Sequence, residues 1–173
     1  ALATPVPNAV EALRDGRVVH WGGRDWTVMV TGGHAPEHAS FYCTEDRILI
    51  AGDHVLPRIT PIISVYEYEP AADPLTDFLE SFARFRALPA ETMVLPSHGL
   101  PYFGLHTRLD QLERHHRERL DATWRALREP ADVHTLAAAL FPHAVTADDF
   151  GFAFSETLAH VNHMVAGGRL RAI

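Results

Sequence analysis

The chain has 173 residues, of which 47% are hydrophobic, and a formal net charge of −7 at pH 7. These values suit a globular protein of one domain, or of one domain with a small addition. The negative charge disfavours binding to nucleic acids or to an anionic membrane, and no run of about 18 apolar residues predicts a transmembrane helix. A single cysteine, Cys43, excludes an internal disulfide. We therefore expect a cytoplasmic protein that does not bind a membrane.

Short apolar runs in the first third of the chain predict β-strands. Arg17–His20 and Trp26–Thr31 flank a pair of glycines, and Ser40–Cys43 and Arg47–Ala51 flank a polar turn, as is typical of hairpins. Residues 52–74 then carry several prolines and little helical periodicity. This segment is expected to be a long loop that forms part of a substrate wall.

Helical periodicity dominates the next part of the chain. Apolar residues recur at three- and four-residue steps over Leu75–Leu88 and again over Leu105–Arg128. Between these segments, Thr92–Leu95 is a short apolar run typical of a buried strand. The order of hairpins, helix, strand and helix predicts an α+β protein with the architecture of one half of an αββα sandwich.

The last part of the chain predicts a small separate unit. Pro130 interrupts the preceding helical pattern, and helices are expected near Val133–Phe141 and Asp149–Ala166. Two glycines end the second of these helices, and the final residues, Arg169–Ile173, could form a strand.

Histidine and aspartate residues follow three of the predicted strands, in segments that also contain glycine or serine. These residues are His34 and His38, Asp53 and His54, and His98. Imidazole and carboxylate are the usual ligands of a divalent metal ion that activates water. Loops at the ends of buried strands can hold such side chains together, so the sequence predicts a metal site.

The three segments resemble motifs of the metallo-β-lactamase superfamily, in particular its glyoxalase II-like members. Residues 31–38 read T-G-G-H-A-P-E-H where the family has T-P-G-H-T-P-G-H, residues 52–53 match its G-D motif, and residues 97–99 match its S-H-G motif. The resemblance implies that His34 binds one metal ion, His98 binds a second, and Asp53 bridges the two. It also implies zinc, with two ions in a complete site, while iron or manganese would suit the same ligands.

Other residues near these motifs are expected to support the site. By the same resemblance, His38 and His54 would lie behind the metal ligands and hold them in place. The substrate pocket is expected to be lined by arginine and aromatic residues of two loops, namely Arg58, Tyr66, Tyr68, Tyr102 and Phe103. No residue of this chain is assigned as a catalytic base.

One family motif is absent from the chain. The ligand set H-x-H-x-D-H, which lies upstream of T-P-G-H in the family, has no counterpart here. We therefore predict that the chain is the C-terminal part of a longer protein, with residues 1–128 forming the second half of the catalytic domain and residues 129–173 a winged-helix-like extension. His34, Asp53 and His98 are too few ligands for a complete site, so this chain alone is expected to bind metal weakly and to lack activity.

The resemblance implies that the parent protein is a metal-dependent hydrolase. A metal-bridged hydroxide would attack an ester, thioester or lactone bond of a small-molecule substrate. One alternative is a ribonuclease of the same fold, although the predicted helix Asp149–Ala166 contains no arginine, which disfavours nucleic-acid binding. Another is a truncated or degenerate fragment that acts as an interaction module. A half-sandwich exposes apolar surface, which could bind a second copy of the chain or the missing N-terminal half.

Further histidines occur on the predicted helices. His115 and His116 lie beside arginines, a pattern that predicts a solvent-exposed basic helix face. Together with His160 and His163, they are expected to be surface or core residues and not metal ligands.

Overall fold

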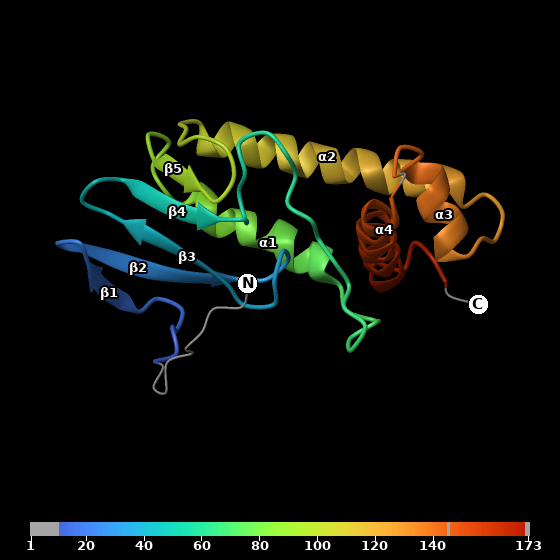
Figure 1. The fold of residues 1–173 in the computed structure, drawn as a ribbon, viewed down its shortest axis with the longest axis horizontal. Coiled ribbons are helices and arrows are strands. Elements are labelled where there is room, and N and C mark those ends of the chain that lie inside the picture. Colours follow the sequence, from blue (N-terminus) through green and yellow to red (C-terminus); the bar gives the residue numbers. More distant parts are fainter. Residues whose placement is uncertain (1–10, 145, 172–173) are drawn as a thin grey trace.

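The computed structural model describes residues 11–144 and 146–171. Within these ranges the chain forms one five-stranded sheet and four helices (Figure 1). The strands are β1 (Val18–Trp21), β2 (Arg24–Thr31), β3 (His38–Cys43), β4 (Ile48–Gly52) and β5 (Met93–Pro96). The helices are α1 (Pro74–Arg86), α2 (Leu105–Ala126), α3 (Val133–Leu140) and α4 (Ala147–Ala166). The predicted α+β class is confirmed, and the predicted elements are all present except the strand at the end of the chain.

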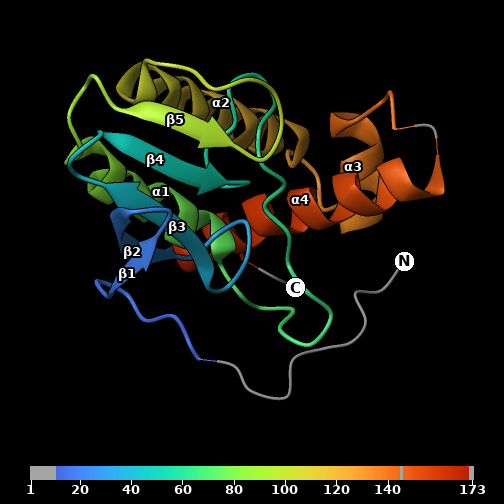
Figure 2. The ribbon, with the colours of Figure 1, turned by 60° about the vertical axis from the view of Figure 1, so that its left-hand side comes forward.

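The sheet has the strand order β1-β2-β3-β4-β5. The first four strands pair antiparallel, whereas β4 and β5 pair in parallel. Parallel neighbours need a crossover connection, which α1 supplies between β4 and β5. As a result, β2, β4 and β5 all run in the same direction, and their carboxyl ends lie at one edge of the sheet. Figure 2 shows this for β4 and β5.

Helix α1 begins where the sequence indicates. The Asp73 side chain accepts a hydrogen bond from the Thr76 backbone N–H at 3.0 Å, and Pro74 occupies the first turn. One apolar stripe of this helix, which includes Phe78, faces the sheet and is fully buried. Gly33 lies against this helix so closely that a Cβ atom there would be 2.5 Å from the Phe78 Cβ. A side chain at position 33 would therefore push the His34 loop away from α1.

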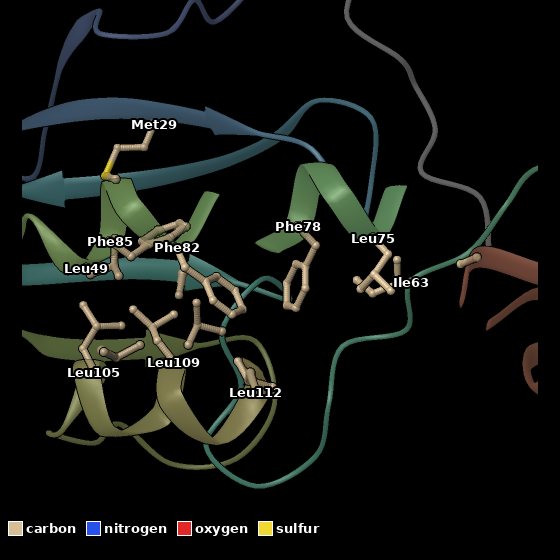
Figure 3. Close-up of a cluster of buried hydrophobic side chains, with 14 of the residues drawn as sticks. Met29, Leu49, Ile63, Leu75, Phe78, Phe82, Phe85, Leu105, Leu109 and Leu112 are labelled. Carbon is tan, nitrogen blue, oxygen red and sulfur yellow. The ribbon is translucent and has the colours of Figure 1, made fainter. Parts of the chain in front are cut away.

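The hydrophobic core lies between one face of the sheet and helices α1 and α2. Figure 3 shows apolar side chains of all three layers, with the phenylalanines of α1 between the sheet and the leucines of α2. The labelled members are Met29, Leu49, Ile63, Leu75, Phe78, Phe82, Phe85, Leu105, Leu109 and Leu112. None of the four helices within the described residues is long and apolar enough to cross a membrane.

The C-terminal helices share this core. Asp132 caps α3 by accepting from the Thr135 backbone N–H at 2.8 Å, and Thr146 caps α4 in the same way. Helix α4 packs against α1 and α2, and its Ala159 and Met164 belong to the same buried cluster as the sheet residues. The boundary predicted between residues 128 and 129 stays a prediction, and α4 shares buried residues with the cluster of the sheet.

The strand predicted at the end of the chain is wrong for residues 169–171. The backbone N–H groups of Arg169 and Leu170 both donate to the Met164 carbonyl, at 2.8 and 3.1 Å. These donors cap the last turn of α4 and are not available to a β-ladder. Residues 172 and 173 lie outside the described ranges, and a winged-helix-like extension stays a prediction.

The exposed basic face predicted for α2 is wrong at His116. This side chain is fully buried, because α4 packs over this part of α2, and its Nδ1 lies 3.2 Å from His160 Nε2. His160 is also buried, whereas the neighbouring arginines Arg114 and Arg117 are exposed. The local run of histidines and arginines does not reveal which of its members face a partner helix.

Candidate metal centre

The three predicted metal ligands come together at one edge of the sheet. His34 follows β2, Asp53 follows β4 and His98 follows β5, and these strands end at the same edge. The Asp53 carboxylate lies between the two imidazoles. Its Oδ1 is 3.3 Å from His98 Nε2, and its Oδ2 is 3.9 Å from His34 Nε2. Each carboxylate oxygen thus faces a different histidine.

Hydrogen bonds fix the orientation of these side chains. His34 Nδ1 lies 2.9 Å from the Ile62 carbonyl oxygen, to which it donates its hydrogen. The lone pair is then on Nε2, the nitrogen that faces Asp53, which is the form that can bind a metal ion. The Ser97 hydroxyl donates to Asp53 Oδ1 and so ties the loop after β5 to the loop after β4.

His54 lies beneath the centre and points away from it. The side chain is fully buried, with Nε2 2.7 Å from Ser81 Oγ and Nδ1 3.5 Å from Thr31 Oγ1. Because the Ser81 hydroxyl donates to the Phe78 carbonyl, it accepts from His54 Nε2–H. Burial lowers the pKa of His54 to about 3, so this imidazole is neutral at pH 7.

His38 lies between the centre and His54. Its ring centroid is 6.1 Å from that of His34 and 5.2 Å from that of His54. A Cβ atom at Gly52, whose φ is +54°, would lie 2.7 Å from His38 Nε2. Glycine is therefore favoured at position 52 both by its positive φ and by the space that the His38 ring needs. The supporting roles predicted for His38 and His54 stay predictions, although both rings pack behind the centre.

The donor set fits part of a metal site. Two ligands of a tetrahedral ion at about 2.1 Å are about 3.4 Å apart, and the Asp53–His98 distance of 3.3 Å is close to this value. The Asp53–His34 distance of 3.9 Å is wider. Within the described residues, no group of three or more histidine, cysteine, aspartate or glutamate side chains is arranged to hold an ion. The arrangement would suit two half-sites that share Asp53, each of which would need further ligands.

The five residues predicted to line a substrate pocket do not lie together. Arg58 and Tyr102 line a cavity of about 520 Å³ that also includes His98, and Phe103 lines an adjoining hollow with Tyr102. Tyr66 instead lines a small cavity of about 60 Å³ beside Gly33, and Tyr68, which is 73% exposed, stacks on Tyr66.

Helix α4 explains where the tyrosines lie. The Ser155 hydroxyl donates to the Val65 carbonyl at 3.0 Å, and Asn162 Nδ2 donates to the carbonyls of Pro70 and Ala72 at 2.9 and 2.8 Å. These bonds hold the second half of the long loop against α4. The tyrosines therefore belong to the part of the loop that α4 binds, away from His98.

Sequence reasoning missed the buried Arg108. This side chain, whose residue is 8% exposed, donates to the carbonyls of Leu56, Ile59 and Arg58 at 2.6, 2.7 and 3.2 Å. It thereby shapes the loop that follows Asp53. In the sequence, Arg108 is one of several arginines on an amphipathic helix, and nothing distinguishes it. The Ile62 carbonyl that orients His34 has no sequence signal either.

Comparisons with known proteins identify the family of the chain. Residues 2–98 match the Metallo-beta-lactamase superfamily, and residues 120–173 match the Metallo-beta-lactamase-like, C-terminal domain. A beta-lactamase domain protein from Burkholderia ambifaria is 39% identical, with a TM-score of 0.92 over 96% of this chain and 50% of that chain. A metallo-beta-lactamase family protein from Thermus thermophilus is 34% identical, with a TM-score of 0.83 over 94% of this chain and 51% of that chain.

A further relative matches this chain over a similar share of its length. The probable metallo-hydrolase YqjP of Bacillus subtilis is 26% identical over 160 residues, which cover 90% of this chain and 49% of that protein. The chain thus spans about half the length of each of these relatives. Because the superfamily match covers more than half of the residues, the chain belongs to the metallo-β-lactamase superfamily, whose members bind metal ions.

Proposed function

We propose that this chain is the second half of a glyoxalase II-like, metal-dependent hydrolase that cleaves an ester, thioester or lactone bond of a small-molecule substrate. The observation that carries the proposal is the position of Asp53, whose two oxygens face His34 and His98 separately. A carboxylate in this position suits a bridge between two cations about 3.5–4 Å apart. Membership of the superfamily and the similarity to a probable metallo-hydrolase support the same reaction class.

The described residues would prepare such a centre in specific ways. Two bound divalent ions would lower the pKa of a water molecule between them towards neutrality and so supply hydroxide. The Ile62 carbonyl keeps the His34 lone pair on Nε2, and Ser97 orients Asp53. His98 borders the 520 Å³ cavity, where a substrate carbonyl could approach the centre. Zinc is the proposed metal, and iron or manganese would suit the same donors.

The remaining metal ligands would come from outside this chain, in the upstream H-x-H-x-D-H segment that the resemblance implies. Phe41, Ile50 and Leu95 pair side by side on the sheet face opposite the core, where they are only half-buried. This apolar face is where we propose that the missing half, or a second copy of the chain, would pack. The chain alone would then bind metal weakly and have no hydrolase activity.

The proposal is tested on the whole protein, expressed from its complete reading frame. We expect hydrolysis of a thioester, an aryl ester or a lactone that is lost in a chelator and restored by zinc. Asp53→Asn should lower kcat/KM by at least about 100-fold, whereas Glu37→Gln, on an exposed residue of a neighbouring loop, should not. Hydrolysis that resists both metal removal and Asp53→Asn would contradict the proposal.

A titration with single-stranded RNA would separate a ribonuclease from a hydrolase of small molecules. Helix α4, the recognition-like helix of the extension, contains no arginine, so we expect no binding of single-stranded RNA in fluorescence anisotropy. Tight, salt-dependent RNA binding would favour a ribonuclease. A whole protein that binds no metal and hydrolyses none of the substrates would favour an interaction module.

A further inference from the structure

The cavity beside His98 has two walls. The first is formed by residues 57–59 of the loop after Asp53, and the second by residues 99–102 after His98. Its volume of about 520 Å³ is in the range of cavities that hold small organic ligands. Because His98 lines the cavity and both walls belong to loops that follow a proposed metal ligand, a molecule in this cavity would lie beside the proposed centre.

The first wall is held by a buried side chain. Arg108 of α2 donates to the carbonyls of Leu56, Arg58 and Ile59, which fixes the loop backbone at three points. Hydrogen bonds from a charged donor are the stronger ones, and this guanidinium is almost fully enclosed. The loop is thus held in place before any ligand binds.

The second wall is held by the sheet. The backbone N–H groups of Val94 and Tyr102 each donate to the carbonyl of the other, at 2.8 and 3.0 Å. The Tyr102 hydroxyl also reaches the Val55 carbonyl at 3.4 Å. Both walls are therefore fixed to the scaffold, as is typical of a preformed binding site.

The chemistry of the walls is mostly apolar. Ile59 and Leu100 are 60% and 81% exposed, and Phe103 in the adjoining hollow is 69% exposed. Large apolar side chains in contact with water at the rim of a cavity are typical of a binding surface. Arg58 is the only basic residue of the cavity lining besides His98. It forms no ion pair within the described part of the chain.

We propose that the substrate carries a bulky apolar acyl group and an anionic group, which occupy this cavity against Leu100 and Ile59 and beside Arg58. This inference rests on the proposed hydrolase function and names the substrate class of the same site. In the reaction, the oxygen of water bonds to the acyl carbon and the acyl C–O bond breaks. One proton of that water leaves with the alcohol, so the products are an acid and an alcohol.

Three p-nitrophenyl esters test the proposal on the zinc-loaded whole protein: the acetate, the octanoate and the monoester of suberate, which has the octanoate chain length and a terminal carboxylate. We expect kcat/KM for the octanoate to exceed that for the acetate by at least about tenfold, since each buried CH₂ group contributes about 0.8 kcal/mol. Leu100→Ser, at a position that is 81% exposed in this chain, should reduce this ratio to below about threefold. Arg58→Gln should lower the suberate-to-octanoate ratio at least about fivefold. Val18→Ser, on an exposed residue of β1, should change neither ratio.

A binding measurement separates this inference from the hydrolase proposal. Calorimetric titration of the metal-free whole protein should show that the octanoate ester binds at least about tenfold more tightly than the acetate ester. Leu100→Ser should remove this difference in affinity. Equal hydrolysis of all three esters without selective octanoate binding would overturn the inference and leave the hydrolase proposal intact. Selective octanoate binding without hydrolysis of any of the three esters would support the cavity and remove aryl esters from the hydrolase proposal. Ratios unchanged in Leu100→Ser and Arg58→Gln would overturn the inference, because the substrate would then lie outside this cavity.

Discussion

At the scale of single residues, the geometry of the centre depends on positions that carry no reactive group. Gly52 precedes Asp53 with a φ of +54°, and its missing side chain makes room for the His38 ring. Ser97 and the Ile62 carbonyl orient Asp53 and His34 through single hydrogen bonds. The positions of the proposed metal ligands therefore depend on the residues packed behind them as much as on the strands that precede them.

Gly52→Ala tests this packing, and Gly22→Ala is its matched control. Gly22 has a φ of +56°, but a Cβ atom there would have no neighbour within 4 Å. Both variants should lose about 1–2 kcal/mol from backbone strain. Gly52→Ala should lose roughly 1–3 kcal/mol more, because its Cβ overlaps His38 Nε2. Urea unfolding of the whole protein measures the free energy of unfolding of both variants. Equal losses would show that the contact with His38 does not affect stability.

At the scale of elements, helix α4 holds two other parts of the molecule in place. Its buried His160 donates from Nδ1 to the Glu156 carbonyl at 2.7 Å, so its Nε2 accepts from His116 Nδ1 of α2. Its Asn162 holds the loop that leads into α1. The helix thus connects α2 and the long loop through specific polar contacts within an apolar interface.

The histidine pair predicts acid sensitivity of the α2–α4 contact. Burial, with neighbouring histidines as a smaller cause, lowers the pKa of His116 to about 3, and burial lowers the pKa of His160 to about 4. The unfolded chain, in which these groups titrate near pH 6.5, binds more protons between about pH 6.5 and 4. The free energy of unfolding should therefore fall with decreasing pH in this window, by about 1.4 kcal/mol per pH unit for each histidine that takes up a proton on unfolding.

Urea unfolding at about pH 7, 6 and 5 checks this dependence across the window in which the unfolded histidines take up protons. His116→Leu removes one titrating group of the pair and should reduce the slope, whereas His20→Leu, on an exposed residue of β1, should leave it unchanged. A slope that is the same in wild type and His116→Leu would show that the pair does not determine the acid response.

The contact of α4 with the long loop predicts that loss of the Asn162 side chain increases local opening of this loop. Asn162→Ala removes two hydrogen bonds, to the carbonyls of Pro70 and Ala72, and should cost about 1–3 kcal/mol in total. Because the loop would open more often, the amide of Ala72, which donates to Glu69, should exchange faster with solvent. Hydrogen-exchange mass spectrometry measures this rate, and Val165→Ala on the same helix serves as the control. Unchanged exchange of the loop in Asn162→Ala would contradict this role of α4.

At the scale of the whole molecule, one hydrophobic core spans the sheet and three helices. Ala159 and Met164 of α4 share this core with residues of β4 and α1. A chain that ends at residue 128 would expose the faces of α1 and α2 that α4 covers. We expect it to lose cooperative unfolding, as followed by circular dichroism in urea. A cooperative transition with the midpoint of the longer chain would show that α4 is dispensable.

Periodicity allowed most of the fold to be predicted from sequence. Strands and helices appear where apolar residues repeat, and the short motifs around His34, Asp53 and His98 placed three proposed ligands at one sheet edge. Contacts between distant segments could not be predicted, because nothing local encodes them. Arg108 resembles any surface arginine of an amphipathic helix, and His116 is buried only because α4 covers it.

Anomalous diffraction at the zinc absorption edge, from crystals of the zinc-loaded whole protein, would show directly whether Asp53 bridges two metal ions. We expect two peaks about 3.5–4 Å apart, on either side of Asp53. One peak should lie between Oδ1 and His98 Nε2, and the other between Oδ2 and His34 Nε2. Metal peaks that do not contact Asp53, or a single peak at His34 or His98 alone, would contradict this expectation.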